Sequence, residues 1–219
     1  MKKVLVTGGS RGIGSQISKL LKEKGYMVET PERSELDLTN LQSIEGYFSH
    51  NTNFDILINN AGINVLAQIE SIEHDSWHKM VAVNLTAPML LIQKVVPYMK
   101  EAKWGRIVNI SSMFSNITKE KRGAYSAVKS GLNGLTRTAA VELAPFGVLV
   151  NSVCPGYVET DLTYQNNSPS EIEKILQDIP IGRMAKAVEI AELVEFLISD
   201  RNSYLTGQSI TIDGGFTLK

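Results

Sequence analysis

The sequence predicts a single α/β domain in which a doubly wound parallel sheet carries helices on both faces. Short apolar, β-branched runs alternate along the chain with longer stretches of helical period. Strands that alternate with helices form right-handed crossovers, and these produce a parallel sheet covered on both sides. The 219 residues suffice for one well-buried domain and are few for two. Because no repeat, low-complexity tract or linker divides the sequence, we expect one domain over 1–219.

Six runs are predicted as strands and five longer stretches as helices. The strands are expected over residues 3–6, 27–30, 55–58, 106–110, 148–153 and 209–212, which are rich in apolar and β-branched side chains. The helices are expected over residues 12–24, 41–49, 75–100, 124–143 and 188–199, where apolar residues recur with helical period. Each predicted helix follows a predicted strand, as the crossovers of a parallel sheet require.

Two segments depart from this alternation. Residues 31–40 read PERSELDLTN and leave no room for a full helix after the second strand. A polar segment, 164–170, follows the Pro155-Gly156 turn and precedes a helical stretch at 171–177. Because an open parallel sheet keeps its ligand beyond the carboxyl ends of its strands, we interpret this second segment as a mobile lid over a substrate. A surface excursion without function is the alternative.

The composition is that of an ordinary globular protein, with 43% hydrophobic residues, 21% charged residues and a formal net charge of −1. This balance supplies no field that would attract nucleic acid or an anionic membrane. Cys154 is the only cysteine, which excludes an intramolecular disulfide and a thiolate cluster. No apolar run approaches the roughly 20 residues of a membrane span. The start, MKKVLVTGGS, does not read as a signal peptide, so we expect a cytoplasmic protein.

The first predicted strand runs directly into a cluster of glycines. Gly8 allows a sharp turn out of the strand, and Gly12 and Gly14 let the next helix approach the sheet and a bound anion closely. These glycines fall at relative positions one, five and seven, so the general dinucleotide fingerprint is not matched. A plain turn is the alternative, but the position between a strand and a helix favours phosphate binding.

Tyr125 and Lys129 are four residues apart in a predicted helix, so their side chains share one face. A tyrosine has an ordinary pKa near 10, too high for an efficient base at neutral pH. A nearby ammonium favours the phenolate, so we expect Lys129 to lower the pKa of Tyr125. The pair is a candidate for proton transfer, although pairs with this spacing also occur on helix surfaces without a function.

Four short motifs occur in a familiar order: TGGSRGIG at 7–14, NNAG at 59–62, YSAVK at 125–129 and the Pro155-Gly156 turn. Together they resemble the short-chain dehydrogenase/reductase family, and the resemblance covers essentially the whole chain. It implies a Rossmann-like fold. It also implies reversible hydride transfer between a nicotinamide cofactor and a carbonyl or secondary alcohol.

The resemblance implies four catalytic residues, which are Asn84, Ser112, Tyr125 and Lys129. Tyr125 would move the proton that accompanies the hydride, and Ser112 would hydrogen-bond the substrate oxygen as charge develops there. Ser111 is an adjacent alternative, but the family spacing to the tyrosine selects Ser112. Asn84 would hold a water that links Lys129 to solvent, with a purely structural asparagine as the alternative.

The same resemblance implies a larger set of cofactor-binding residues. The glycine turn would bind the pyrophosphate, the segment 60–62 the adenine ribose, and the residues after Pro155-Gly156 the nicotinamide end. Asp37 and Leu38 would contact the adenine edge. The full set is Gly8, Ser10, Arg11, Gly12, Ile13, Gly14, Arg33, Asp37, Leu38, Asn60, Ala61, Gly62, Tyr125, Lys129, Pro155, Gly156, Val158 and Thr160. No metal is expected, because His74 and His78 have no third ligand near them in sequence.

The end of the second strand bears on the choice between NAD(H) and NADP(H). NAD-preferring relatives carry an acid there that binds the ribose hydroxyls and repels a 2′-phosphate, and this chain has Glu29 and Glu32 nearby. Arg11, however, lies where NADP-preferring relatives keep a basic residue, and Arg33 could supply a second cation. We therefore expect NADP(H) in preference to NAD(H).

The resemblance is greatest to 3-oxoacyl-(acyl-carrier-protein) reductases of fatty acid biosynthesis, so a 3-oxoacyl thioester is the first expected substrate. Lys103 and Arg106 are available to dock a carrier protein, whereas Phe146 stands where such reductases often carry arginine. A sugar, polyol or other small polar ketone is the alternative substrate. A catalytically silent NADP(H) sensor that binds a partner is an alternative of another class. Relatives pair their long helices, and we expect a homodimer or homotetramer.

Three further features have two interpretations each. Cys154 is expected to be a buried structural thiol, with a reactive one as the alternative. Ser115 replaces a glycine that many relatives carry three residues after the catalytic serine, which could narrow the floor of the active site. The run Lys119-Glu-Lys-Arg122 either receives an anionic substrate or is a solvated loop.

Overall fold

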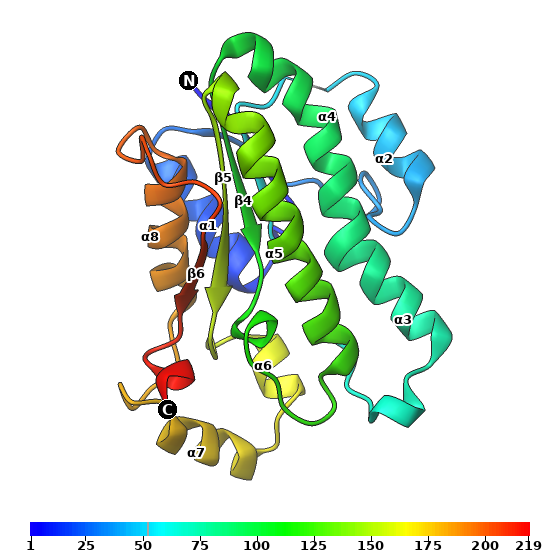
Figure 1. Cartoon of the computed structure of the whole chain (residues 1–219), viewed down its shortest axis with the longest axis vertical. Helices are drawn as coiled ribbons and strands as arrows, with labels where there is room; N and C mark the ends of the chain where they lie inside the picture. Colours follow the sequence, from blue (N-terminus) through cyan, green and yellow to red (C-terminus); the bar gives the residue numbers. More distant parts are fainter. Residues whose placement is uncertain (52) are drawn as a thin grey trace.

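A computed structural model describes residues 1–51 and 53–219 (Figure 1). Six parallel strands form one sheet in the order β2-β1-β3-β4-β5-β6. Their bounds are β1 Lys3–Val6, β2 Met27–Glu29, β3 Ile56–Asn59, β4 Gly105–Ile110, β5 Val148–Pro155 and β6 Ser209–Ile212. The predicted fold class is confirmed, and the predicted strands differ from these by no more than two residues at either end.

Eight α-helices accompany the strands within the described residues. They are α1 Gly12–Glu23, α2 Leu41–Phe48, α3 His74–Val81, α4 Ala87–Ala102, α5 Gly123–Leu143, α6 Asp161–Gln165, α7 Pro169–Asp178 and α8 Ala187–Ile198. The prediction of one regular helix over 75–100 is wrong, because a π-helical turn at Ala82–Thr86 separates α3 from α4. The short helix α6 was also missed, since its five residues are too few to show a helical period.

The helices form two layers, one on each face of the sheet. Figure 1 shows α1 and α8 on one side and α2, α4 and α5 on the other. Alternate residues of a strand serve opposite layers. Leu5 packs with the α2, α4 and α5 layer, while Val4 and Val6 pack with α1 and α8. Both faces are therefore buried, which explains why the strands read as nearly continuous apolar runs.

The helical stretch His74–Ala102 has 29 residues and is apolar enough, by length and composition, to cross a membrane. The sequence analysis did not anticipate such a stretch. Leu91, Val95 and Met99 of α4 are fully buried in the core cluster on one face of the sheet. A core helix of this kind meets the same criterion, so the finding is weak support for a membrane span.

The parallel register brings four strand ends to one edge of the sheet. Val6 pairs with Ile58, Asn59 with Asn109, and Ile110 with Val153. The chain segments that leave β1, β3, β4 and β5 therefore lie side by side, although they are far apart in the sequence. Each of the four sequence motifs contains, or directly follows, one of these segments, and the edge is where an open sheet binds its ligand.

Candidate active site

A pocket of about 890 Å³ lies at this edge of the sheet. Its walls come from the turns after β1, β3, β4 and β5, from the segment after β2, from the start of α5 and from α6. Every residue of the predicted cofactor set lines this pocket, and so do Ser112, Tyr125 and Lys129. The pocket therefore brings together predicted residues that lie up to 152 positions apart in the sequence, from Gly8 to Thr160.

The glycine turn has the backbone that its sequence predicts. Gly8 and Gly12 have φ angles of +65° and +54°, in the left-handed region that favours glycine. A Cβ on Gly14 would overlap the Gly8 carbonyl oxygen and the side-chain nitrogen of Asn60. Close packing of α1 against the turn therefore requires glycine at position 14.

The NNAG segment braces the same turn. The side-chain nitrogen of Asn60 donates to the carbonyl oxygens of Thr7 and Gly8, at 3.0 and 2.9 Å. The Thr7 hydroxyl accepts from the backbone N–H groups of Asn60 and Ala61, both at 3.1 Å. These bonds fix the two loops relative to each other, so the phosphate turn and the ribose segment form one rigid wall.

Tyr125 and Ser112 line the pocket together, and Ser112 is near enough to act on the pKa of Tyr125. Ser112 follows β4, and its hydroxyl accepts from the backbone N–H of Phe114 at 3.2 Å. Burial raises the pKa of Tyr125, and the Ser112 side chain and the charge of Arg122 offset only part of that rise. The expected lowering of the Tyr125 pKa is therefore wrong for this structure, because desolvation of the phenolate outweighs the nearby positive charge.

Lys129 lies behind the tyrosine and is 3% exposed. Its ammonium donates to the Ile110 carbonyl at 2.7 Å and lies 5.7 Å from the centroid of the Tyr125 ring. Burial lowers the pKa of Lys129 from 10.5 to about 8. This lysine can thus lose and regain a proton near neutral pH, which suits a group that passes protons.

Asn84 is fully buried and lies in the π-helical turn between α3 and α4. Its amide nitrogen donates to the carbonyl oxygens of Met80 and Ile63, both at 3.0 Å. Its amide oxygen accepts from the Ile63 backbone N–H at 3.2 Å. Asn84 does not line the pocket, but a Cβ on Gly62 would contact both Asn84 and Lys129, so the three residues adjoin.

The two adjacent serines have different environments. The Ser111 hydroxyl donates to the Lys129 carbonyl at 3.2 Å, whereas Ser112 faces Tyr125. Ser115 lies beneath the pocket, where its hydroxyl donates to the Ser112 carbonyl at 2.6 Å and accepts from Asn133 at 2.8 Å. It does not line the pocket, so the expected narrowing of the floor does not arise from its side chain.

A family model described as Enoyl-(Acyl carrier protein) reductase matches residues 29–217. The chain belongs to the short-chain dehydrogenase/reductase family. It is therefore an oxidoreductase that interconverts CH–OH and C=O groups with a nicotinamide cofactor.

Similar proteins cover nearly the whole length of this dehydrogenase/reductase. A 3-oxoacyl-(acyl-carrier-protein) reductase of Vibrio cholerae is 34% identical over 98% of this chain and 96% of its own length. An acetoacetyl-CoA reductase of Shinella zoogloeoides is 35% identical over 96% of each chain. The solved structure of a 4-hydroxyisoleucine dehydrogenase complexed with NADH matches with a TM-score of 0.93 and 29% identity, and the match covers 100% of both chains.

The acid at the end of β2 is turned away from the pocket. One oxygen of Glu29 accepts from the Tyr47 hydroxyl at 3.0 Å and from the Asn51 side chain at 2.6 Å. The other pairs with the Lys3 ammonium at 2.9 Å. Glu29 does not line the pocket, whereas Glu32 does. Tyr47 and Asn51 were missed by the sequence analysis, because nothing in their spacing indicates contact with β2.

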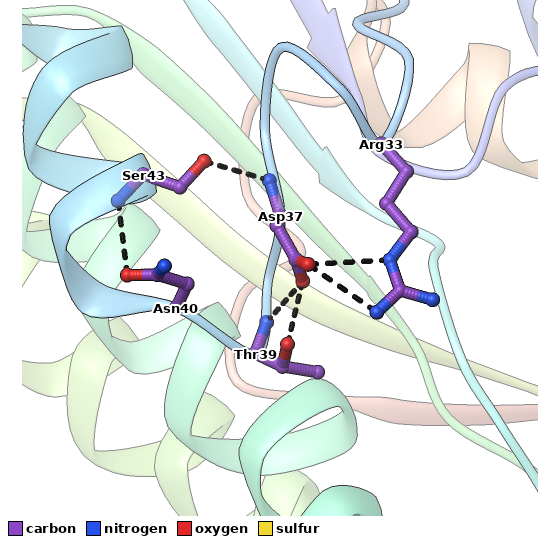
Figure 2. Close-up of polar contacts among 5 residues, drawn as sticks. All are labelled: Arg33, Asp37, Thr39, Asn40 and Ser43. Atoms are coloured by element: carbon purple, nitrogen blue, oxygen red, sulfur yellow. Dashed lines mark hydrogen bonds and ion pairs between the residues drawn. The ribbon is translucent and has the colours of Figure 1, made fainter.

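Arg33 and Asp37 contact each other at the pocket wall (Figure 2). Asp37 also accepts from the Thr39 backbone and hydroxyl at 2.9 and 2.7 Å, and its own N–H donates to Ser43 at 2.9 Å. Asn40 caps α2 by accepting from the N–H groups of Gln42 and Ser43. The segment after β2 is thus ordered by side-chain bonds in place of a helix.

Further polar residues outside the predicted set line the pocket, among them Arg122, Asn64 and Asn167. Arg122 is buried and lies directly before α5. Asn64 follows the NNAG segment, and Asn167 lies between α6 and α7. In the sequence, Arg122 is one residue of a basic run, and nothing there distinguishes it from its neighbours. The two asparagines lie in loops, and the sequence does not predict which loop side chains reach the pocket. Among residues 1–51 and 53–219, no group of three His, Cys, Asp or Glu side chains is placed to hold a metal ion.

Proposed function

We propose that this protein is an NADP(H)-dependent ketone reductase in which Asn84, Ser112, Tyr125 and Lys129 carry out the proton chemistry. The observation that supports this most directly is that Ser112, Tyr125 and the buried Lys129 meet in one pocket with the glycine turn, with the Lys129 ammonium 5.7 Å from the centroid of the Tyr125 ring. A silent sensor would need none of these groups in contact. The nicotinamide supplies the hydride when the cofactor is bound.

The raised pKa of Tyr125 suits the direction of carbonyl reduction. A phenol that stays protonated at neutral pH can donate its proton to the oxygen of a reduced carbonyl. Ser112 hydrogen-bonds the same oxygen as negative charge develops on it. Lys129, with a pKa of about 8, then restores the proton of Tyr125, and Asn84 and its neighbours connect Lys129 to solvent.

The residues of the pocket fit a dinucleotide along its whole length. The start of α1, after two glycines with positive φ, offers free N–H groups to the pyrophosphate. Asp37 and Leu38 line the pocket and would border the adenine edge, and 60–62 would border the adenine ribose. Val158 and Thr160, beyond the Pro155-Gly156 turn, also line the pocket and would hold the nicotinamide carboxamide and the adjacent phosphate.

Two contacts favour NADP(H) over NAD(H). Glu29 is held by Tyr47, Asn51 and Lys3 and so does not repel a 2′-phosphate from the pocket. Arg11 lines the pocket, and no hydrogen bond or ion pair within the described residues engages its side chain. Glu32 also lines the pocket, and its carboxylate argues for NAD(H), because it would repel a 2′-phosphate. A free guanidinium at the phosphate turn is well suited to a phosphate monoester.

Two substrate classes remain, and different observations support them. The similarity to a 3-oxoacyl-(acyl-carrier-protein) reductase and an acetoacetyl-CoA reductase supports a 3-oxoacyl thioester. Docking of a carrier protein has weaker support than the sequence suggested, because Arg106 is 5% exposed and bonds to the carbonyl oxygens of Gly105, Gly147 and Asn202. The polar side chains of Asn64, Arg122 and Asn167 in the pocket support a small polar ketone.

The proposal also covers the oligomeric state, a lid over the pocket and the cellular location. We infer a homodimer or homotetramer, supported by the apolar Val141 of α5, which is 77% exposed. Asn166 and Asn167 of the segment 164–170 line the pocket, which supports a lid role for this segment. A cytoplasmic enzyme accords with the net charge of −1 and with the nature of the proposed substrates.

The experiment that tests the function is a panel of ketones assayed by the absorbance of the reduced cofactor. The panel contains an acetoacetyl thioester, sugar ketones and short oxo acids, each with NADPH and with NADH. We expect turnover of at least one ketone, with a higher kcat/KM for NADPH. Tight NADPH binding without turnover of any ketone or alcohol would instead support the silent sensor.

A further inference from the structure

Arg122 places a buried positive charge beside the proposed catalytic groups. It lies three residues before Tyr125, is 4% exposed and lines the same pocket as Ser112 and Tyr125. Lys119 and Lys121 of the same loop are exposed. Burial therefore separates Arg122 from the rest of the basic run, which otherwise has the character of a solvated loop.

The guanidinium of Arg122 has no counterion among residues 1–51 and 53–219. No hydrogen bond or ion pair joins it to another described side chain, and its Nε is buried without a partner. The ring of Phe114, 5.0 Å from Cζ, covers one face. An arginine stays charged at neutral pH, and a buried charge without a partner is costly. Such an arrangement is kept where a ligand supplies the opposite charge.

The acid that could neutralise Arg122 is held elsewhere. Glu171 is close enough for its charge to act on Arg122, but no ion pair forms between them. Its carboxylate instead accepts from the Ser168 backbone and hydroxyl, at 2.7 and 2.8 Å, in the capping box of α7. The other groups that act on the Arg122 charge are the phenols of Tyr157 and Tyr125, and neither is a carboxylate that could pair with it.

Two amide oxygens of the pocket also lack partners. The side-chain oxygens of Asn64 and Asn167 are buried, and neither accepts a hydrogen bond from any residue that the structure describes. Both residues line the pocket together with Arg122. Buried acceptors are normally satisfied, so these two suit hydroxyl donors of a ligand. Arg122 thus contributes a cation, and Asn64 and Asn167 contribute two acceptors, to the same pocket.

We propose that Arg122 binds an oxyanion of the substrate, a carboxylate or a phosphate, so that the enzyme reduces an anionic hydroxylated ketone. This inference rests on the proposed reductase function and narrows its substrate to the small polar class. Residues three apart at the start of a helix lie about 5–6 Å apart at Cβ, so the anion lies only a few bonds from the carbonyl. The carbonyl carbon accepts the hydride from NADPH, its oxygen accepts the Tyr125 proton, and the oxyanion is unchanged.

Matched substrate pairs test the proposal on the wild-type enzyme. The pairs are 2-, 3- and 4-oxo acids with their methyl esters, and dihydroxyacetone phosphate with dihydroxyacetone. We expect at least one anionic member to exceed its neutral partner about tenfold or more in kcat/KM. The carboxylate and phosphate pairs distinguish the two kinds of anion. If the neutral member is equal or better in every pair, the inference is overturned while the reductase function stands.

Variants of Arg122 test the residue itself. Arg122→Met removes the charge, and we expect about a 100-fold loss of kcat/KM for the anionic substrate, mainly through KM, and a much smaller loss for the neutral partner, through the pKa of Tyr125. Arg122→Lys keeps the positive charge but lacks the planar guanidinium. Its kcat/KM for the anionic substrate should lie between those of the wild type and Arg122→Met. Lys121→Met, a neighbouring exposed lysine, is the matched control and should not change the preference. Equal losses for both partners, or a weaker affinity for NADPH, would show that Arg122 serves the fold or the cofactor instead.

Binding provides a readout that does not depend on turnover. Calorimetric titration of the NADP+-saturated enzyme with the anionic compounds should give binding that Arg122→Lys weakens and Lys121→Met leaves unchanged. If no ketone is reduced but this binding is found, the reductase function fails and the anion site stands. If neither Arg122 variant folds, preference and binding by the wild-type enzyme decide alone. If the wild-type enzyme shows neither a preference for the anionic substrates nor binding of the anionic compounds, the anion site is overturned.

Discussion

Arg33 and Asp37 form an ion pair at the wall of the cofactor pocket, with the guanidinium Nε and Nη2 3.3 and 3.2 Å from one carboxylate oxygen. Hydrogen bonds from Thr39, together with this contact, lower the pKa of Asp37. The side chain of Arg33 is 70% exposed, so the pair is screened by solvent and easily rearranged. A 2′-phosphate near Arg33 would compete with Asp37 for its charge.

The first prediction separates the two arginines that border the cofactor. Arg11→Ala should lower kcat/KM for NADPH roughly tenfold or more, because its side chain has no competing partner within the described residues. Arg33→Ala should cost less, because Asp37 already shares its charge. Initial rates with both cofactors check this, and NADH is the internal control. Losses of the same size with NADH would contradict a phosphate contact.

The second prediction concerns Tyr125 and Ser112. Tyr125→Phe should lower kcat by roughly 10²–10⁴ by removing the proton donor, while NADPH binding measured by fluorescence is retained. Ser112→Ala should lower kcat by roughly 10²–10³. Because Ser112 acts on the pKa of Tyr125 and both are proposed to bind the same substrate oxygen, the double variant should lose less than the product of the single losses. Ser111→Ala is the matched control, and a loss there equal to that of Ser112→Ala would reassign the role.

The third prediction is the pH dependence of reduction. Burial lowers the pKa of Lys129 to about 8, and we propose that its ammonium restores the proton of Tyr125. We therefore expect kcat to fall as the pH rises through about 8, once Lys129 is neutral. Stopped-flow rates between pH 6 and 10 check this with roughly one pH unit between points. A kcat that is constant across that range would contradict a proton relay through Lys129.

The fourth prediction concerns stability at the same residue. Burial lowers the pKa of Lys129 from 10.5 to about 8, so the folded state binds fewer protons than the unfolded state between these values. The free energy of unfolding therefore contains a penalty below pH 8 that is relieved as the pH rises toward 10.5. Lys129→Met should remove up to about 3 kcal/mol of penalty at pH 7, less about 1 kcal/mol for the lost bond to Ile110.

Urea denaturation of both proteins at pH 7 and pH 10 checks this difference. The advantage of the methionine variant should shrink at the higher pH. An advantage that does not change with pH would mean that the stabilisation comes from packing and not from the lysine charge.

The fifth prediction compares two helical glycines. Gly14→Ala should abolish tight NADPH binding and lower the free energy of unfolding by roughly 2 kcal/mol, because its Cβ would overlap Gly8 and Asn60. Gly46→Ala in α2 is the matched control, since a Cβ there meets nothing within 4 Å. It should raise stability by about 1 kcal/mol through helix propensity. Thermal unfolding and fluorescence titration measure both effects, and equal behaviour of the two variants would contradict the close approach at Gly14.

Local patterns were enough to predict several parts of this protein. Residues adjacent in sequence were enough to predict the strand at Lys3–Val6 and the glycine turn that follows it, where Gly8 and Gly12 have positive φ. The shared face of Tyr125 and Lys129 follows from helical spacing. The order of the four motifs was sufficient to predict the family. The roles of the catalytic residues remain predictions, although three of the four line one pocket and the fourth adjoins it.

Other parts depended on contacts between distant segments. The π-helical turn at Ala82–Thr86 has no period that a sequence pattern reveals, yet it contains the buried Asn84, bonded to Ile63. Arg106 reads as a surface cation but lies under the loop that contains Asn202. The helix that begins at Leu41 brings Tyr47 to Glu29, and this contact removes an acid from the pocket.

The sequence by itself determined the fold class, the phosphate turn and the pair Tyr125 and Lys129, because each depends on backbone preferences and spacings within one or two elements. The tertiary structure decided which charges are buried and which are paired. Burial of Tyr125 raises its pKa where the sequence predicted a lowering, and the buried guanidinium of Arg122 has no counterion among the residues that the structure describes. Desolvation and pairing depend on side chains from several elements, so no single stretch of sequence could determine them.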